Sequence, residues 1–372
     1  MRISQTLSAA LLMLLATCSA AREVDHSGQA AGRASAQGHA VVLAYHHVAA
    51  NTPRSTSIRV EAFDAHLKYL ANENVQVWPL SRITRTLTQG ETLPPNVVGL
   101  SFDDAYESVL ETVHPRLQAR GWPYTVFVTT QAIDAGRSPY MTWDQLRQLA
   151  RDGVELGNHS DTHNHLVRRR ANESPAAWQA RVTADLQQAN ARIYAETGVT
   201  PTLFAYPYGE YTPALTTLVE ALNLTGFGQH SGAIGVHSNF TALPRFPMGG
   251  AYTDLNRLAT SVRTQPLYID ASPPGPLLLH DYDKAPRPNL RISLAPGDYN
   301  LDQFACYASG QGRMLVVPLD QAGDYQLQPR RALTPGRTKY NCTVPHSSKP
   351  GVFYWWSYLL MTSAADGRWY SD

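Results

Sequence analysis

The apolar and polar positions of the chain follow two different patterns, one before and one after about residue 287. From Ala40 to about Asp281, short apolar runs alternate with segments in which apolar residues recur every three or four positions. The runs predict buried strands, and the segments predict amphipathic helices. Strands that alternate with helices are typical of parallel β/α units, so we predict a (β/α) barrel of eight strands or fewer.

The individual elements follow from these patterns together with their start and stop residues. The predicted strands cover residues 40–45, 75–78, 97–100, 124–129, 154–157, 202–206, 226–228 and 276–279, and residues 243–248 are expected to be extended. The predicted helices cover residues 60–73, 105–120, 142–153, 174–198 and 256–263, with further helices near residues 81 and 212. Ser81 is expected to cap its helix, Thr142 to open a capping box, and Pro115 to kink or split the helix it lies in.

After Arg287 the apolar residues alternate with polar ones at period two. The clearest segments are residues 290–294, 314–317, 325–327 and 352–360, and Gly and Pro separate them. This pattern predicts a small all-β, sandwich-like domain over residues 287–372, after a barrel over residues 39–286. Its Trp and Tyr residues are interpreted as core, with a sugar-stacking face as the alternative.

Composition limits the classes of function. The 372 residues carry a formal net charge of +1, which gives no electrostatic basis for binding nucleic acid. Beyond the first residues, no stretch is long and apolar enough to span a bilayer.

The N-terminus has the features of an export signal. Arg2 precedes an apolar stretch over residues 7–16, and the sequence Leu-Ala-Thr-Cys ending at Cys18 resembles a bacterial lipobox. The resemblance implies cleavage before Cys18, lipidation of its thiol, and a lipoprotein on the periplasmic side of the outer membrane. Residues 1–18 would then be the signal and lipobox segment, and the polar residues 19–38 a flexible tether. The alternative is ordinary cleavage after Ala20 or Ala21, which gives a soluble periplasmic or secreted protein.

The three cysteines agree with the lipoprotein interpretation. If Cys18 carries lipid, Cys306 and Cys342 remain as an even pair in an oxidising compartment. We therefore predict a disulfide between Cys306 and Cys342 rather than a metal site built from two isolated cysteines.

Polar side chains gather where the predicted strands end. The clusters are Asp103-Asp104, His159 with His163, residues 206–209, and His280-Asp281. The carboxyl ends of barrel strands meet on one face, so four such clusters predict a single active site. Taken alone, the aspartates could be a helix N-cap and the histidines could be polar turn residues. Together they indicate an Asp-His-His site with an open position for water, which suits Zn²⁺ but also Co²⁺, Ni²⁺ or Fe²⁺.

These clusters carry a family resemblance. The segments 101–104, 159–163, 204–209 and 278–281 resemble the first, second, third and fifth motifs of the NodB-type polysaccharide deacetylases, carbohydrate esterase family 4. Residues 45–48 and 63–70 further resemble exported deacetylases of poly-β-1,6-N-acetylglucosamine. The resemblance implies the deacetylase type of (β/α) barrel and a polysaccharide substrate.

The resemblance also implies a role for each motif residue. Asp104, His159 and His163 would bind the metal, and Asp103 would be the general base. His280 would be the general acid for the departing amine. The backbone N–H of Tyr208 would stabilise the oxyanion.

Two positions depart from the family pattern. Ala105 stands where the family often has Gly, and Ala205 stands where the third motif often begins with Arg. Arg245 is expected to supply that guanidinium from another strand.

We therefore predict a metal-dependent N-deacetylase that acts on an N-acetylhexosamine polysaccharide outside the cytoplasm. The alternatives are a deacetylase of peptidoglycan or of an O-acetylated polysaccharide such as xylan, and a catalytically inactive carbohydrate-binding lipoprotein.

Overall fold

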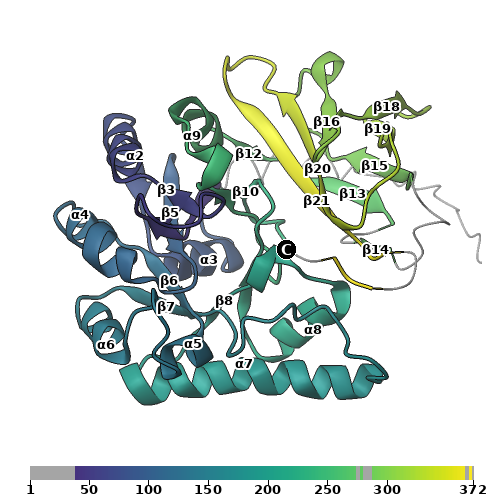
Figure 1. The fold of residues 1–372 in the computed structure, drawn as a ribbon. Helices are drawn as coiled ribbons and strands as arrows, with labels where there is room; N and C mark the ends of the chain where they lie inside the picture. The colour runs from purple at the N-terminus through teal and green to yellow at the C-terminus, as the bar shows by residue number, and fades with distance from the viewer. Residues whose placement is uncertain (1–37, 274–276, 280–286, 365–367, 371–372) are drawn as a thin grey trace, which may run out of the picture.

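The computed structural model describes residues 38–273, 277–279, 287–364 and 368–370 (Figure 1). The predicted signal segment with Cys18 and most of the tether lie outside this range, as do His280 and Asp281. Among the described residues, no helix is both long and apolar enough to cross a membrane.

A nine-stranded sheet that curls into a half-barrel forms the first part of the chain, which confirms the predicted fold class. Its six main strands are parallel and lie in the order β1, β5, β6, β7, β8 and β9, with β4 beside β5, and β10 and β11 beside β1. Their bounds are β1 Ala40–Tyr45, β4 Gln76–Val77, β5 Val97–Phe102, β6 Thr125–Val128, β7 Glu155–Asn158, β8 Leu203–Ala205, β9 Thr225–Phe227, β10 Ala233–Ile234 and β11 Phe246–Pro247. A short separate pair is formed by β2 (His47–Val48) and β3 (Ser57–Ile58).

Helices cover the outside of this sheet, and the long α7 runs along its lower edge in Figure 1. Their bounds are α2 Val60–Asn72, α3 Leu80–Thr88, α4 His114–Gln118, α5 Thr130–Asp134, α6 Trp143–Arg151, α7 Pro175–Thr197, α8 Pro213–Ala221 and α9 Leu255–Val262. The capping box of Thr142 is confirmed. Pro115 lies in the first turn of α4, after a π-helical turn over Val109–Val113, so the predicted long helix is split. The prediction for Ser81 is wrong, because α3 already begins at Leu80 and its N-cap is Pro79.

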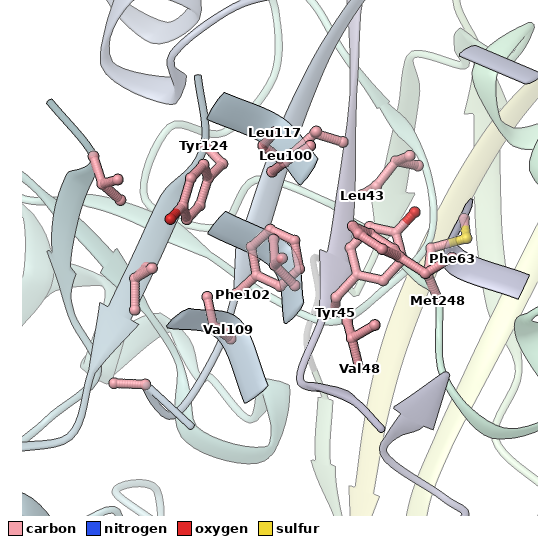
Figure 2. Close-up of a cluster of buried hydrophobic side chains, with 14 of the residues drawn as sticks. Leu43, Tyr45, Val48, Phe63, Leu100, Phe102, Val109, Leu117, Tyr124 and Met248 are labelled. Carbon is pink, nitrogen blue, oxygen red and sulfur yellow. The ribbon is translucent and has the colours of Figure 1, made fainter. Parts of the chain in front are cut away.

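The core between the sheet and its helices contains a group of aromatic rings packed among aliphatic side chains (Figure 2). Tyr45 on β1 stacks on Phe102 on β5 with ring centroids 5.3 Å apart, and Phe63 on α2 meets Tyr45 edge-on at 5.4 Å. These side chains are at most 1% exposed. Packing between these buried rings holds the ends of β1 and β5 against each other. It therefore helps to position the residues that follow the two strands.

The segment 243–247 runs between the two edges of the half-barrel. Leu243 forms a parallel bridge with Phe227 of β9, and Phe246 pairs with Leu43 of β1. Arg245, which lies between these two contacts, therefore points from the closing segment into the barrel, where it is fully buried.

Two further sheets make up the C-terminal region, which is all-β as predicted. One has the order β12, β21, β20, β16, β17 with β14 also beside β21, and the other has the order β13, β15, β19, β18. Their bounds are β12 Gln265–Pro266, β13 Ile269–Ser272, β14 Leu277–Leu279, β15 Leu290–Leu294, β16 Ala305–Ala308, β17 Gly312–Arg313, β18 Leu315–Pro318, β19 Asp324–Gln328, β20 Gly336–Pro345 and β21 Phe353–Thr362. The predicted disulfide is confirmed, since Cys306 on β16 is bonded to Cys342 on β20.

Each of these two sheets contains strands from before and from after residue 286 in the sequence. β12 and β14 pair with β21, and β13 pairs with β15. The expectation that residues 276–279 form the last strand of the barrel is therefore wrong: Leu277 pairs with Leu360 of β21 instead. The division of the chain into residues 39–286 and 287–372 stays a prediction.

Candidate metal centre and active site

Asp103 and Asp104, which follow strand β5, point in different directions. After Phe102 the chain leaves the sheet, and Asp104 and Ala105 both adopt left-handed backbone conformations, with φ of 73° and 60°. Glycine adopts this conformation without a steric penalty, which gives a physical reason for the family's frequent Gly where this chain has Ala105. As a result, Asp103 faces Arg245 and Asp104 faces two histidines.

His159 and His163 converge on Asp104. Their Nε2 atoms lie 3.3 and 3.1 Å from Asp104 Oδ1, and one ligand atom from each of the three residues lies within 4.8 Å of the other two. His159 Nδ1 is 2.8 Å from the carbonyl oxygen of Ala205 on β8. A proton on Nδ1 that is donated to this carbonyl leaves the lone pair on Nε2 directed at the site, as in metal-binding histidines.

Hydrogen bonds to α7 hold the loop between His159 and His163 in place. Asn158 Nδ2 donates to the carbonyl oxygen of Leu186, and Asn158 Oδ1 accepts the N–H of Ser160. Asp185 on α7 accepts the backbone N–H of Asp161 at 2.9 Å and the hydroxyl of Thr162 at 2.6 Å. This loop is therefore fixed before any ligand binds, which lowers the entropic cost of assembling the three side chains around an ion.

The three residues fit a divalent cation. Asp104 Oδ1 is buried and accepts no hydrogen bond in a favourable geometry, although two imidazole nitrogens face it. A buried carboxylate oxygen without a hydrogen bond is costly unless an ion or a proton compensates it. Burial acts to raise the pKa of Asp104, but the neighbouring His159 and His163 hold that pKa well below its usual range. Two imidazole nitrogens and one carboxylate oxygen suit Zn²⁺ and similar borderline metals.

Asp103 is held beside this centre by a buried ion pair. Arg245 Nη1 donates to Asp103 Oδ1 at 2.7 Å and Nη2 donates to Oδ2 at 2.8 Å, and both side chains are fully buried. Arg245 also donates to the carbonyl oxygen of Gly228 and the hydroxyl of Ser101. Burial acts to raise the pKa of Asp103, but Arg245 and nearby imidazoles bring that pKa below its ordinary value, so the carboxylate is ionised at neutral pH.

The ring of Tyr208 packs against the rings of His163 and His165. The Tyr208 backbone is left-handed with φ of 59°, and the ring stacks on His165 with centroids 3.8 Å apart and lies 4.9 Å from that of His163. Arg337 on β20 donates to the carbonyl oxygen of Tyr208 at 2.8 Å. The C-terminal sheet therefore touches the loop that carries Tyr208.

Two neighbours of the site were not predicted from the sequence. His46, at the end of β1, has Nε2 3.7 Å from Asp103 Oδ2, and Gln229 Nε2 lies 3.4 Å from the same oxygen. The pair His46-His47 directly after an apolar strand was the signal that could have indicated His46. Of the predicted site residues, His280 lies outside the described part of the chain, and the roles of all of them stay predictions.

Comparison with known proteins links this geometry to a family. Residues 90–227, which include both aspartates and both histidines, match the polysaccharide deacetylase family. The poly-β-1,6-N-acetyl-D-glucosamine N-deacetylase of Escherichia coli (strain K12) is 24% identical over 240 residues, which cover 55% of this chain and 36% of that protein. The chain thus matches about a third of the length of these curated relatives.

Solved structures share the fold. The deacetylase PplD of Streptococcus pyogenes is 18% identical with a TM-score of 0.54, over 61% of this chain and 99% of that chain. IcaB from Ammonifex degensii is 22% identical with a TM-score of 0.53, over 61% of this chain and 98% of that chain. The family match and the shared fold agree with each other. The chain therefore contains a polysaccharide deacetylase domain of the NodB type, carbohydrate esterase family 4.

Proposed function

We propose that the protein is a metal-dependent deacetylase that hydrolyses N-acetyl groups of an N-acetylhexosamine polysaccharide. The observation that carries the proposal is the convergence of Asp104, His159 and His163 on one point, with the ionised Asp103 beside them. The similarity to the Escherichia coli poly-β-1,6-N-acetyl-D-glucosamine N-deacetylase supports poly-β-1,6-N-acetylglucosamine as the polymer.

The chain's own groups divide the chemistry between them. A divalent cation bound by Asp104, His159 and His163 would supply Lewis acidity that acidifies water and polarises the acetyl carbonyl. Zn²⁺ fits this set, and Co²⁺, Ni²⁺ or Fe²⁺ would fit it as well. Asp103 accepts the proton of the attacking water, since Arg245 keeps it ionised and fixes its direction.

The water oxygen bonds to the acetyl carbon, and the backbone N–H of Tyr208 donates to the oxyanion that forms on the former carbonyl oxygen. The carbon–nitrogen bond then breaks, and the amine leaves with a proton donated by His280. The products are acetate and a free sugar amine.

Metal content and acetate release, measured together on the same samples, test the assignment. Asp104→Ala is expected to lose both metal and activity. Asp103→Asn is expected to keep its metal at saturating concentration while kcat falls by roughly 10²–10⁴-fold, the range for loss of a general base. Asp144→Asn, which changes an 89% exposed carboxylate on α6, is the matched control and should change neither. A metal-free Asp103→Asn beside a metal-filled Asp104→Ala would reverse the two roles.

A panel of substrates tests the specificity. Acetate release from β-1,6 and β-1,4 N-acetylglucosamine oligomers, from peptidoglycan and from acetylxylan is compared with and without a chelator. Release from peptidoglycan or acetylxylan alone would replace the proposed polymer. Binding of glycan without release from any of the four would identify an inactive carbohydrate-binding protein.

We further propose that the protein is exported and anchored by lipid on Cys18. The apolar stretch after Arg2 and the lipobox-like residues before Cys18 support this. Fractionation of cells that carry Cys18→Ser should move the protein from the outer membrane to the soluble periplasm. An unchanged membrane fraction would contradict the anchor.

A further inference from the structure

A cavity of about 570 Å³ lies between the barrel and the C-terminal sheet. His46 and Gln229 form its end next to the active site, and the side chains of both lie within 3.7 Å of Asp103 Oδ2. β20 and β21 supply the opposite wall, and α9 borders it as well. This end of the cavity therefore adjoins Asp103, the proposed general base.

The lining of the cavity is aromatic and cationic. Tyr252, Tyr307, Phe353 and Trp355 contribute rings. Lys339 and Arg257 contribute positive charge, and the other lining residues include hydroxyl and amide groups but neither Asp nor Glu. The carboxylate of Asp103 at its inner end is already paired with Arg245.

Lys339 on β20 lies where the C-terminal sheet meets the barrel. Its Nζ donates to the carbonyl oxygen of Gln229, so the ammonium is fixed beside the active-site end of the cavity. No carboxylate pairs with it among the residues that the structure describes. Burial, together with Arg337, lowers the pKa of Lys339 to about 8, so most of its charge is still present at pH 7.

Resting on the proposed function, we propose that this cavity binds the sugar units next to the one that loses its acetyl group, and selects them in the N-acetylated form. Aromatic rings stack on the apolar faces of sugars, and hydroxyl and acetyl oxygens can accept from Lys339 and Asn341. A deacetylated unit carries an ammonium group, which the cations repel where no carboxylate is present to pair with it.

The selection has a consequence for the product. Each amine that is released makes its neighbours poorer ligands for the cavity. Successive deacetylations should therefore occur at sugar units that are separated along the polymer. The product should contain scattered amines rather than contiguous blocks of them.

Binding measurements test the selection separately from catalysis. The ligands are the β-1,6-linked pentasaccharide of N-acetylglucosamine and the same pentasaccharide with all five amines free, at about pH 6. Binding is read from tryptophan fluorescence immediately after mixing in a stopped-flow instrument, and acetate is measured in the same samples. We expect the acetylated ligand to bind at least about tenfold more tightly, with a smaller ratio at high salt.

Variants of Lys339 locate the effect. Lys339→Gln should reduce the ratio of the two affinities by about tenfold, and Lys339→Arg should preserve this ratio. The matched control is Lys349→Gln, which changes an exposed lysine outside the cavity. Arg257→Gln, an exposed position on α9, should reduce the ratio without risk to the core.

The outcomes separate the two proposals. Equal affinities for the two pentasaccharides, or a Lys339→Gln variant that behaves like Lys349→Gln, would overturn the selection even if acetate is released. Retained selection with no acetate from any glycan would refute the proposed activity and leave the cavity assignment standing.

Discussion

The ion pair between Asp103 and Arg245 is expected to stabilise the fold as well as to serve the reaction. Two parallel hydrogen bonds of 2.7 and 2.8 Å join the groups, and neither side chain is exposed. We predict that Arg245→Met, which keeps an unbranched side chain of similar length but removes the charge, destabilises the protein. The reason is that it leaves the Asp103 carboxylate buried without a counterion.

The magnitude follows from the geometry. With the charge centres about 4 Å apart and an effective dielectric constant near 20, the attraction is about 4 kcal/mol. Breaking a buried pair from either side typically costs about 3–5 kcal/mol. Removal of both charges by Asp103→Asn with Arg245→Met should cost less than the sum of the single changes, by about 2 kcal/mol or more.

Urea unfolding of the wild type, the two single variants and the double variant measures this coupling. The readout is the free energy of unfolding and does not depend on bound metal if a chelator is present throughout. Additivity of the two single changes to within about 0.5 kcal/mol would refute the reasoning, because the charges would then not stabilise each other.

Two further predictions concern stability. Replacing Cys306 and Cys342 by Ser should lower the free energy of unfolding by roughly 3–4 kcal/mol, since the disulfide closes a loop with a sequence separation of 36. Thermal unfolding without reductant measures this loss, and an unchanged transition temperature would contradict the prediction. Burial lowers the pKa of His230 to about 3, so the unfolded chain binds more protons than the folded chain as pH falls from about 6.5 to 3. Stability should therefore fall across this window by up to about 1.4 kcal/mol per pH unit from this group, and His230→Gln should flatten the fall more than His237→Gln at an exposed position. Parallel pH profiles of the two variants would exclude His230 as a source.

The sequence predicted the elements whose signals are local. β1, β5 and α7 were all indicated by apolar periodicity and by capping residues, because burial of one face or run leaves that pattern in consecutive residues. β20 was not predicted, although its buried Tyr340, Cys342 and Val344 alternate with polar residues; only its first inward position, Thr338, is polar.

The site was predicted in part for the same reason. Asp104, His159 and His163 follow predicted strands, and strand order in a barrel brings such residues together. The contacts of His46 and Gln229 with Asp103 depend on side-chain reach across the barrel, about which periodicity carries no information. The pairing of β14 with β21 is equally non-local, because any exposed strand edge can accept a parallel partner.

The shared sheets mean that the unit of sequence similarity and the unit of folding differ in this protein. A chain that ends at residue 286 would retain β12, β13 and β14 but lose the strands with which they pair, β21 and β15. Three strand edges would then present unpaired backbone groups, which is a template for aggregation. Phe246, which packs edge-on against Trp355 at 5.4 Å, would lose its cover as well. The smallest piece of this chain suited to expression is therefore one that continues through β21.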